Sequence, residues 1–196
     1  MSQRTAQLSR KTKETDISIS INLDGNGEST VCTGIGFFDH MLTHLAKHSL
    51  CDIDIKCSGD LDVDGHHTVE DIGIALGKLF SSAWGDKAGI VRYGSAIIPM
   101  DEALVMCAVD LSGRGFVNCK LNIDKDMIGS FDTELVPEFF RALCNNAGIN
   151  AHIIQIEGSN AHHIVEAAFK AFAKSLRKAI SLDKRIEGIP STKGVL

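Results

Sequence analysis

The sequence lacks several features that would assign it to other functional classes. Its 196 residues carry a net charge of −5 and no long basic run, which argues against nucleic acid as a partner. No apolar run approaches the ~20 residues that span a bilayer, and the polar segment 1–14 has no apolar signal-peptide core. There is no Walker or dinucleotide-binding fingerprint. We therefore expect a cytoplasmic protein that binds neither membranes nor nucleic acid.

The cysteines give no indication of a metal site or of disulfide bonds. None of the six forms a C-x-x-C pair, and most lie in apolar, strand-like segments. We expect them to be reduced and to pack as small hydrophobic residues, as is usual in the cytosol. With 44% hydrophobic and 23% charged residues, the chain has the composition of a globular protein and the length of one domain or two small half-domains.

One short motif, H-H-x-x-E, occurs twice. The copies lie at 66–70 and 162–166, which are 96 residues apart, and a long amphipathic helical stretch follows each. On a helix, side chains at i and i+4 share a face, so the first His and the Glu of each motif can bind one ion. The second His is rotated by roughly 100° and is directed toward a different ion. The pair of motifs therefore predicts a site for two metals.

The donor types restrict the metal and suggest further ligands. Imidazole together with carboxylate favours Mn, Fe, Co or Zn over Ca or Mg. If each ion takes one motif's His–Glu pair and the other motif's second His, it still needs a fourth protein ligand. His40 lies 26 residues before His66, and Glu138 lies 24 before His162. We expect these two residues to be equivalent and to supply one ligand each.

Asp71 lies four residues after His67, but Ala167 stands at the matching place in the second motif. We therefore expect Asp71 to orient or cap rather than to ligate. Lys170 lies four residues after Glu166 and should share its face of the helix.

The duplication extends over the whole chain. The first half predicts strands 16–23, 29–33 and 51–57, a turn at 24–27, and helices 37–49 and 65–84. The second half predicts strands 103–111, 116–123 and 152–157, a turn at 112–115, helices 133–146 and 160–182, and an extra strand 91–98 before them. Each half is thus ββαβα, which predicts an α+β fold with helices packed on mostly antiparallel sheets. We expect one compact unit of two half-domain repeats, 1–90 and 91–196 with its C-terminal tail, in which the glycine-rich turns close hairpins.

Four segments resemble one enzyme family. Residues 34–42, 62–71, 160–171 and the tail 190–196 are similar, in this order, to imidazoleglycerol-phosphate dehydratase in its stand-alone form. The resemblance covers essentially the whole chain. It implies a fold like domain 2 of ribosomal protein S5 and dehydration of D-erythro-imidazoleglycerol phosphate to imidazole acetol phosphate in histidine biosynthesis. It also implies a 24-subunit shell with two Mn ions per site, held between subunits.

The resemblance further implies roles for individual residues. The ligands implied for one ion are His40, His67, His162 and Glu166. Those implied for the other are His66, Glu70, His163 and Glu138, where many family members have His at the last position. The implied catalytic groups are Glu14, Glu70 and Glu166. The residues implied to contact substrate are Glu14, His44, His48, Arg92, Arg114, Lys170, Ser191 and Lys193.

Two other functions are compatible with the same metal ligands. A binuclear metallohydrolase would attack a phosphate ester with a metal-bound hydroxide and release inorganic phosphate. A non-catalytic shell protein would use the ions only to join subunits, but it would have no use for cations such as Lys170, Arg92 and Lys193 around an anion. In the dehydration, the imidazole ring of the substrate serves as the electron sink, and a positioned acid–base group moves the protons.

Overall fold

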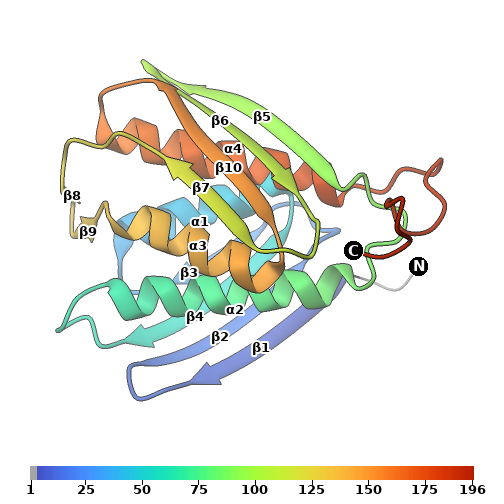
Figure 1. The fold of residues 1–196 in the computed structure, drawn as a ribbon. Coiled ribbons are helices and arrows are strands. Elements are labelled where there is room, and N and C mark those ends of the chain that lie inside the picture. The colour runs from blue at the N-terminus through green and yellow to red at the C-terminus, as the bar shows by residue number, and fades with distance from the viewer. Residues whose placement is uncertain (1–3) are drawn as a thin grey trace.

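The computed structural model describes residues 4–196, which form two similar halves (Figure 1). The first half contains β1 (Thr5–Lys11), β2 (Thr15–Asn22), β3 (Ser29–Cys32), α1 (Gly36–Ser49), β4 (Asp52–Gly59) and α2 (His66–Trp84). The second contains β5 (Tyr93–Met100), β6 (Ala103–Asp110), β7 (Phe116–Lys120), β8 (Met127–Ile128), β9 (Phe131–Asp132), α3 (Leu135–Ala147), β10 (Asn150–Glu157) and α4 (Ala161–Ile180). The expected α+β fold of two repeated halves is confirmed.

Each half is built on a four-stranded sheet with the same topology. The strand orders are β1-β2-β4-β3 and β5-β6-β10-β7. In each sheet the first three strands pair antiparallel, and the last strand pairs parallel with its neighbour. Alternate residues of a strand face opposite sides, so Ile17, Ile19 and Ile21 of β2 are buried against the helices while the residues between them face outward.

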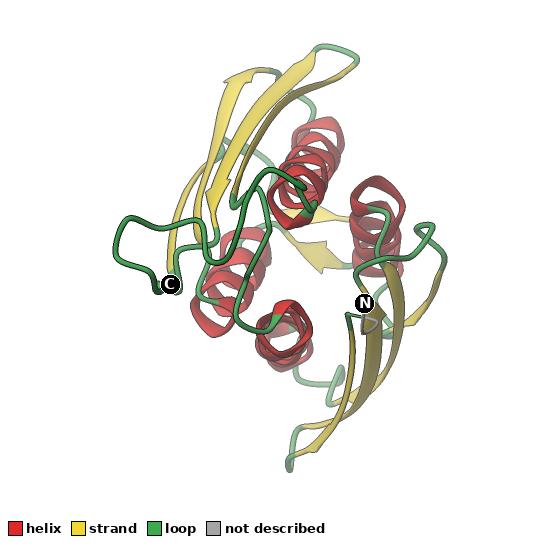
Figure 2. Cartoon of the chain, turned by 90° about the vertical axis from the view of Figure 1, so that its right-hand side faces the viewer, coloured by secondary structure: helices red, strands yellow, loops and turns green. Residues whose placement is uncertain are grey.

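The two sheets form the outer layers and the helices lie between them (Figure 2). α1 packs against α4 and α2 against α3, so each helix pair joins one half to the other. Buried phenylalanines fill the centre; the ring centroids of Phe140 and Phe169 are 4.8 Å apart. Burial of each such side chain contributes on the order of 1.5–3 kcal/mol. Within residues 4–196, no helix is long and apolar enough to cross a membrane.

The sequence does not predict β1, and this changes the description of the repeat. Ala6 and Leu8 are the only apolar side chains of this strand, so the alternation is too weak to be recognised. β1 occupies the place in the first sheet that β5 occupies in the second. The strand expected at 91–98 is therefore not an extra element, and each half is βββαβα.

The glycine-rich turns are not hairpins, contrary to expectation. The turn at 24–27 connects β2 to β3, but β4 lies between these two strands in the sheet. The turn at 112–115 likewise connects β6 to β7 across β10. The inserted strand comes later in the chain in both halves, so the local strand–turn–strand pattern cannot reveal it.

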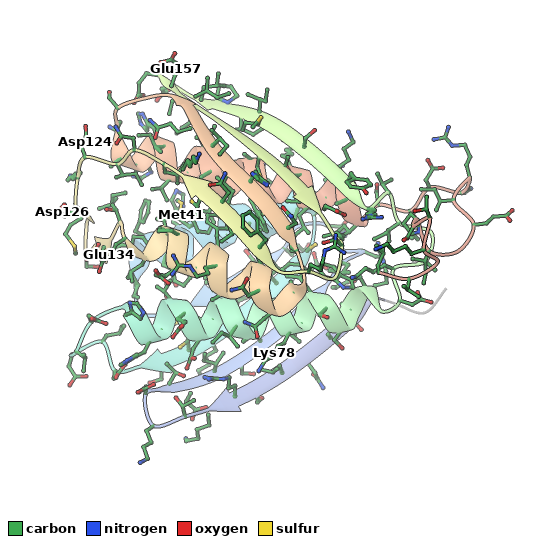
Figure 3. The ribbon with its side chains drawn as sticks, in the orientation of Figure 1. Met41, Lys78, Asp124, Asp126, Glu134 and Glu157 are labelled. Carbon is green, nitrogen blue, oxygen red and sulfur yellow. The ribbon has the colours of Figure 1, made fainter. Side chains whose placement is uncertain are left out.

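Segment 121–134 has no counterpart of similar length between β3 and α1. It contains the short β8–β9 pair and lies at the end of the molecule where α2 and α4 begin, as Asp124, Asp126 and Glu134 show in Figure 3. The insertion therefore sits beside the two H-H-x-x-E motifs.

Asp71 connects α2 to the first sheet. Its buried carboxylate accepts a hydrogen bond from Oγ1 of Thr15 at 2.5 Å and pairs with the guanidinium of Arg10. The sequence predicts that Asp71 orients or caps rather than ligates. In the structure it instead fixes the first turns of α2 on β1 and β2, because its side chain points toward the sheet.

α2 and α3 approach each other backbone to backbone at two glycines. A Cβ atom on Gly73 would lie 3.0 Å from the carbonyl oxygen of Phe139, and one on Gly77 would lie 2.5 Å from that of Leu143. Phe169 stands at the position of α4 that matches Gly73. The close approach is therefore a property of one helix pair and not of the other.

We expect Gly77→Ala to lower the free energy of unfolding by about 1–3 kcal/mol, because a methyl group there must displace the backbone of α3. Thermal or urea unfolding at fixed protein concentration measures this. Gly36→Ala is the control, since a Cβ on Gly36 meets no described atom within 4 Å. Equal effects of the two substitutions would contradict the close approach.

Candidate metal and catalytic site

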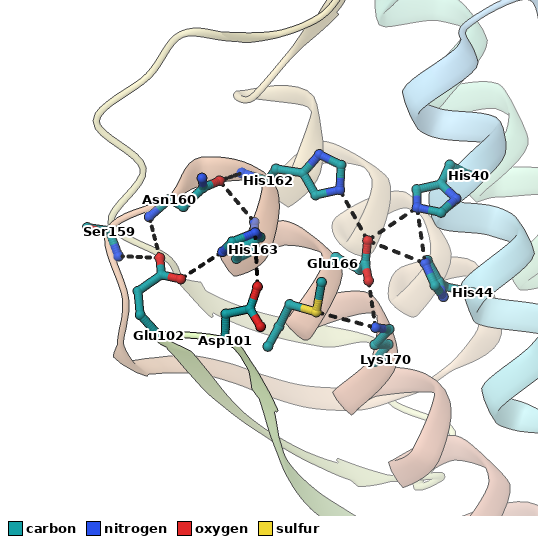
Figure 4. Close-up of polar contacts among 11 residues, drawn as sticks. His40, His44, Asp101, Glu102, Ser159, Asn160, His162, His163, Glu166 and Lys170 are labelled. Carbon is teal, nitrogen blue, oxygen red and sulfur yellow. Dashed lines mark hydrogen bonds and ion pairs between the residues drawn. The ribbon is translucent and has the colours of Figure 1, made fainter.

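Several side chains converge on the buried carboxylate of Glu166 in α4 (Figure 4). Its Oε2 lies 3.2 Å from Nε2 of His40 and 3.2 Å from Nε2 of His162. Nε2 of His44 lies 3.4 Å from the same oxygen, and Nζ of Lys170 donates to Oε1 at 2.5 Å. His162, Glu166 and Lys170 follow one face of α4 at four-residue spacing, as expected, and α1 supplies the other two residues.

Three of these residues form a group that can hold a metal ion. Ligand atoms of His40, His162 and Glu166 all lie within 4.8 Å of one another. Two imidazoles and one carboxylate form a donor set that fits a divalent transition ion. One chain thus brings together three of the four ligands expected for the first ion, and His67 is the one that is not among them.

The surroundings keep the carboxylate of Glu166 ionised and the imidazoles of His44 and His48 neutral. Burial alone would raise the pKa of Glu166, but the hydrogen bond from Lys170 and the proximity of His44 lower that pKa to about 2. Burial lowers the pKa of His44 to about 4, although Glu166 opposes this shift. Burial also lowers the pKa of His48, and the positive charges of Lys170 and Lys174 lower it further. An ionised carboxylate and neutral imidazoles are the forms that bind metal ions.

The first motif has different surroundings. Nδ1 of His67 lies 3.0 Å from Oδ2 of Asp60, and its Nε2 lies 3.9 Å from Oε1 of Glu14. His66 lines a cavity of about 390 Å³ whose wall includes Phe131 of the inserted segment. Glu70 is exposed. Within the described residues, no hydrogen bond or ion pair joins this motif to the cluster around Glu166.

Glu138 and His163 also have partners of their own. Nη1 of Arg141 donates to both carboxylate oxygens of Glu138 at 2.5 Å. Nδ1 of His163 lies 2.7 Å from Oε2 of Glu102, and its Nε2 lies 3.5 Å from Oδ2 of Asp101. The four ligands expected for the second ion are therefore not brought together within one chain.

Glu138 nevertheless occupies the position of α3 that His40 occupies in α1. The residues that end these helices, Leu50 and Gly148, are both left-handed, with φ of 60° and 69°. They are 98 residues apart, which is also the separation of His40 and Glu138. α1 packs on α4, which carries the second motif, and α3 packs on α2, which carries the first, so Glu138 and His40 stand at matching places on helices that pack against the two motif helices.

Four of the residues implied to contact substrate lie at the other end of the molecule: Arg92, Arg114, Ser191 and Lys193. The backbone N–H of Arg92 donates to the carbonyl of Ala179 at 2.9 Å. At 1.5 Å per residue, Ala179 is about 25 Å along α4 from His162. The guanidinium of Arg92 pairs with Asp110 at 2.7 Å and donates to the carbonyl of Pro190 at 2.9 Å.

Arg114, Ser191 and Lys193 lie near Arg92. Arg114 is exposed and follows Gly113, which lies beside Leu196 at the end of the tail. Oγ of Ser191 accepts a hydrogen bond from the N–H of Lys193 at 3.2 Å. Figure 1 shows this tail at the right, where α2 and α4 end, and the two motifs at the left, where these helices begin. Lys170 and His44, which are also implied to contact substrate, lie instead in the histidine cluster.

Sequence reasoning did not single out Asp60, Asp101 and Glu102, although each contacts a motif histidine. Glu102 lies 88 residues after Glu14, and β5 begins 88 residues after β1. The repeat therefore pairs Glu102 with Glu14 and could have identified it from the sequence. Asp60 gives no such signal, because Gly158 stands at its matching place after β10.

The chain is similar in sequence and in fold to proteins of one family. A sequence model of the family described as imidazoleglycerol-phosphate dehydratase matches residues 33–176. A relative of that name from Desulforamulus reducens is 55% identical over 196 residues, covering 100% of both chains. One from Cereibacter sphaeroides is 57% identical over 194 residues, covering 98% of this chain and 100% of the relative. The crystal structure of the Staphylococcus aureus enzyme is 42% identical with a TM-score of 0.84, covering 91% of this chain and 99% of that one.

Proposed function

Because the chain belongs to the imidazoleglycerol-phosphate dehydratase family, we propose that a di-metal site built between subunits binds the imidazole ring of its substrate. The chain is a hydro-lyase of histidine biosynthesis. It removes water from D-erythro-imidazoleglycerol phosphate and leaves imidazole acetol phosphate. The observation that carries the proposal is the convergence of His40 and His162 on the buried carboxylate of Glu166.

We propose two Mn²⁺ ions per site, with other divalent transition ions as substitutes. His40, His162 and Glu166 of one chain would hold one ion together with His67. The ligands of the other ion would be His66, Glu70, His163 and Glu138. When bound, the ions would hold the imidazole ring and draw electron density from it.

Glu14 is the proposed acid–base group. It stands in the tight turn between β1 and β2, where Oγ1 of Thr12 accepts hydrogen bonds from the N–H of Glu14 at 3.1 Å and of Thr15 at 2.9 Å. Its carboxylate faces Nε2 of His67, the nitrogen that would bind the metal. A substrate ring at that ion would therefore come within reach of the Glu14 carboxylate, which can accept or return a proton.

The division of the site residues over the molecule supports a composite site. The Arg92 backbone is about 25 Å along α4 from the first histidine of the second motif, more than a small phosphorylated substrate can span. We therefore propose that Arg92, Arg114, Ser191 and Lys193 bind the phosphate of a substrate whose imidazole ring is bound by the histidines of another subunit. Lys170 would neutralise charge beside the metal cluster.

The outer faces of the two sheets support an assembly of subunits. Ile97, Met106 and Ile154 are cross-strand neighbours on the outer face of the second sheet, and Ile97 is 56% exposed. The matching residues of the first sheet are polar: Ser9, Ser18 and Lys56. An apolar sheet face of this kind is typical of an interface. We propose a homo-oligomer, and by resemblance a 24-subunit shell.

We also propose a cytoplasmic location. The six cysteines, all within the described residues, are free. Burial raises the pKa of Cys107 to about 12 and that of Cys57 to about 11, so these thiols stay protonated and unreactive.

We expect Glu14→Gln to lower kcat by about 10²–10⁴-fold, because the amide cannot transfer a proton. Mn²⁺ occupancy should stay at the wild-type level, since Glu14 is not a proposed ligand. Steady-state kinetics and elemental analysis of the same preparation measure both. Glu28→Gln removes the same charge at an exposed loop position and serves as the control. An unchanged kcat in Glu14→Gln would disprove the assignment.

The composite site predicts complementation between inactive variants. Assemblies of Glu166→Gln alone or Arg114→Ala alone should have little activity, because every site lacks one group. Unfolding and reassembling the two together should restore part of the activity, since some sites then combine the intact groups of different subunits. If the mixture has no more activity than the separate variants, Glu166 and Arg114 do not serve one site from different chains.

A further inference from the structure

The second histidine of each motif is held at Nδ1 by a carboxylate. In His163 this nitrogen lies 2.7 Å from Oε2 of Glu102 (Figure 4), and in His67 it lies 3.0 Å from Oδ2 of Asp60. An ionised carboxylate only accepts hydrogen bonds, so Nδ1 of each ring carries the proton and donates. In the neutral ring Nε2 is then the unprotonated nitrogen, which can bind an ion. Oδ2 of Asp101 lies 3.5 Å from this nitrogen in His163, and Oε1 of Glu14 lies 3.9 Å from it in His67.

Glu102 is itself fixed in place. Its second oxygen, Oε1, accepts hydrogen bonds from the N–H of Asn160 at 2.7 Å and of Ser159 at 3.2 Å, just before α4. The side chain of Asn160 in turn accepts from the N–H groups of His162 and His163. The turn between β5 and β6 thus holds both the start of α4 and the ring of His163.

Asp60 has an equivalent connection to the first half. Its backbone N–H donates to the carbonyl of Glu14 at 3.0 Å, which joins the end of β4 to the turn that contains the proposed acid–base group. Oδ1 of Asp60 is buried and has no hydrogen-bond partner in the described part of the chain. The carboxylate is therefore directed at His67 through Oδ2 alone.

The repeat supplies these two carboxylates from different places. The counterpart of Glu102 is Glu14, which lies on the Nε2 side of His67, whereas Glu102 lies on the Nδ1 side of His163. The counterpart of Asp60 is Gly158. The hydrogen bond to Nδ1 therefore arises twice from positions that the duplication does not relate, so it is not a by-product of the repeat.

We infer that Asp60 and Glu102 are positioning residues that fix the tautomer and orientation of His67 and His163, so that Nε2 of each ring is presented to a metal ion. This inference rests on the di-metal site proposed above. Each carboxylate would then control one of the two ions, because the two histidines belong to different ligand sets. Carboxylate partners of this kind typically change metal affinity by about 10–100-fold.

Glu102→Gln is the sharpest variant. The amide oxygen can still accept from the N–H groups of Ser159 and Asn160, which preserves the start of α4. The amide NH₂ then faces Nδ1 of His163 and donates to it, so the ring proton moves to Nε2 and the metal ligand is lost. In Asp60→Asn, an NH₂ facing His67 has the same effect, and an NH₂ turned the other way is buried without a partner.

The experiment is a titration of the chelator-stripped assembly with Mn²⁺, in which electron paramagnetic resonance measures the free ion. In each variant we expect one of the two ions per site to bind about 10–100-fold more weakly. Assembly size and melting temperature of the metal-free protein should equal those of the wild type. Excess Mn²⁺ should restore kcat, which a loss of catalytic chemistry would not allow.

Two matched variants serve as controls. Glu157→Gln changes an exposed residue at the end of β10 (Figure 3), and Asp62→Asn changes an exposed residue two positions after Asp60. Both should bind Mn²⁺ as the wild type does. Wild-type affinity for both ions in Glu102→Gln and in Asp60→Asn would overturn the inference and leave the metal site standing. Failure of the wild type itself to bind Mn²⁺ would overturn the proposed site and the inference together.

Discussion

The buried carboxylate of Glu166 is the group on which the arrangement of the site depends. A buried charge is stable only when it is paired and hydrogen-bonded, and here Lys170, His40, His44 and His162 surround it. His40 and His44 belong to α1 in the first half, whereas the carboxylate belongs to α4 in the second. The contact that assembles the metal ligands is therefore also a contact between the two halves.

Duplication explains the architecture of the two halves, and the differences between the copies explain why their site residues have different surroundings. Both halves share one sheet topology and one motif. The helix pairs differ, because Gly73 and Gly77 let α2 and α3 approach closely while Phe169 lies in the matching part of α4. The sheets differ as well, since one outer face is polar and the other apolar. Glu14 and Glu102 stand at equivalent positions but face opposite nitrogens of their histidines.

Much of this could be predicted from the sequence, and the failures have physical causes. The four-residue spacing placed His162, Glu166 and Lys170 on one face, and the structure shows them in contact. The order of strands could not be predicted, because β4 and β10 enter their sheets after the strands that they separate. Periodicity also could not show that the two motifs lie on different helix pairs, so the expected ligand sets are only partly formed in one chain. Glu138 pairs with Arg141, which lies one turn further along α3, and the sequence analysis did not predict this ion pair.

The most direct test is turnover of imidazoleglycerol phosphate by chelator-stripped wild-type protein and by Glu166→Gln, each with and without added Mn²⁺. The wild type should form the dehydrated ketone, with its phosphate still attached, only when the ion is added. Glu166→Gln should form little product under either condition. Full turnover by the stripped protein without any divalent ion, or release of inorganic phosphate in place of the ketone, would contradict the account.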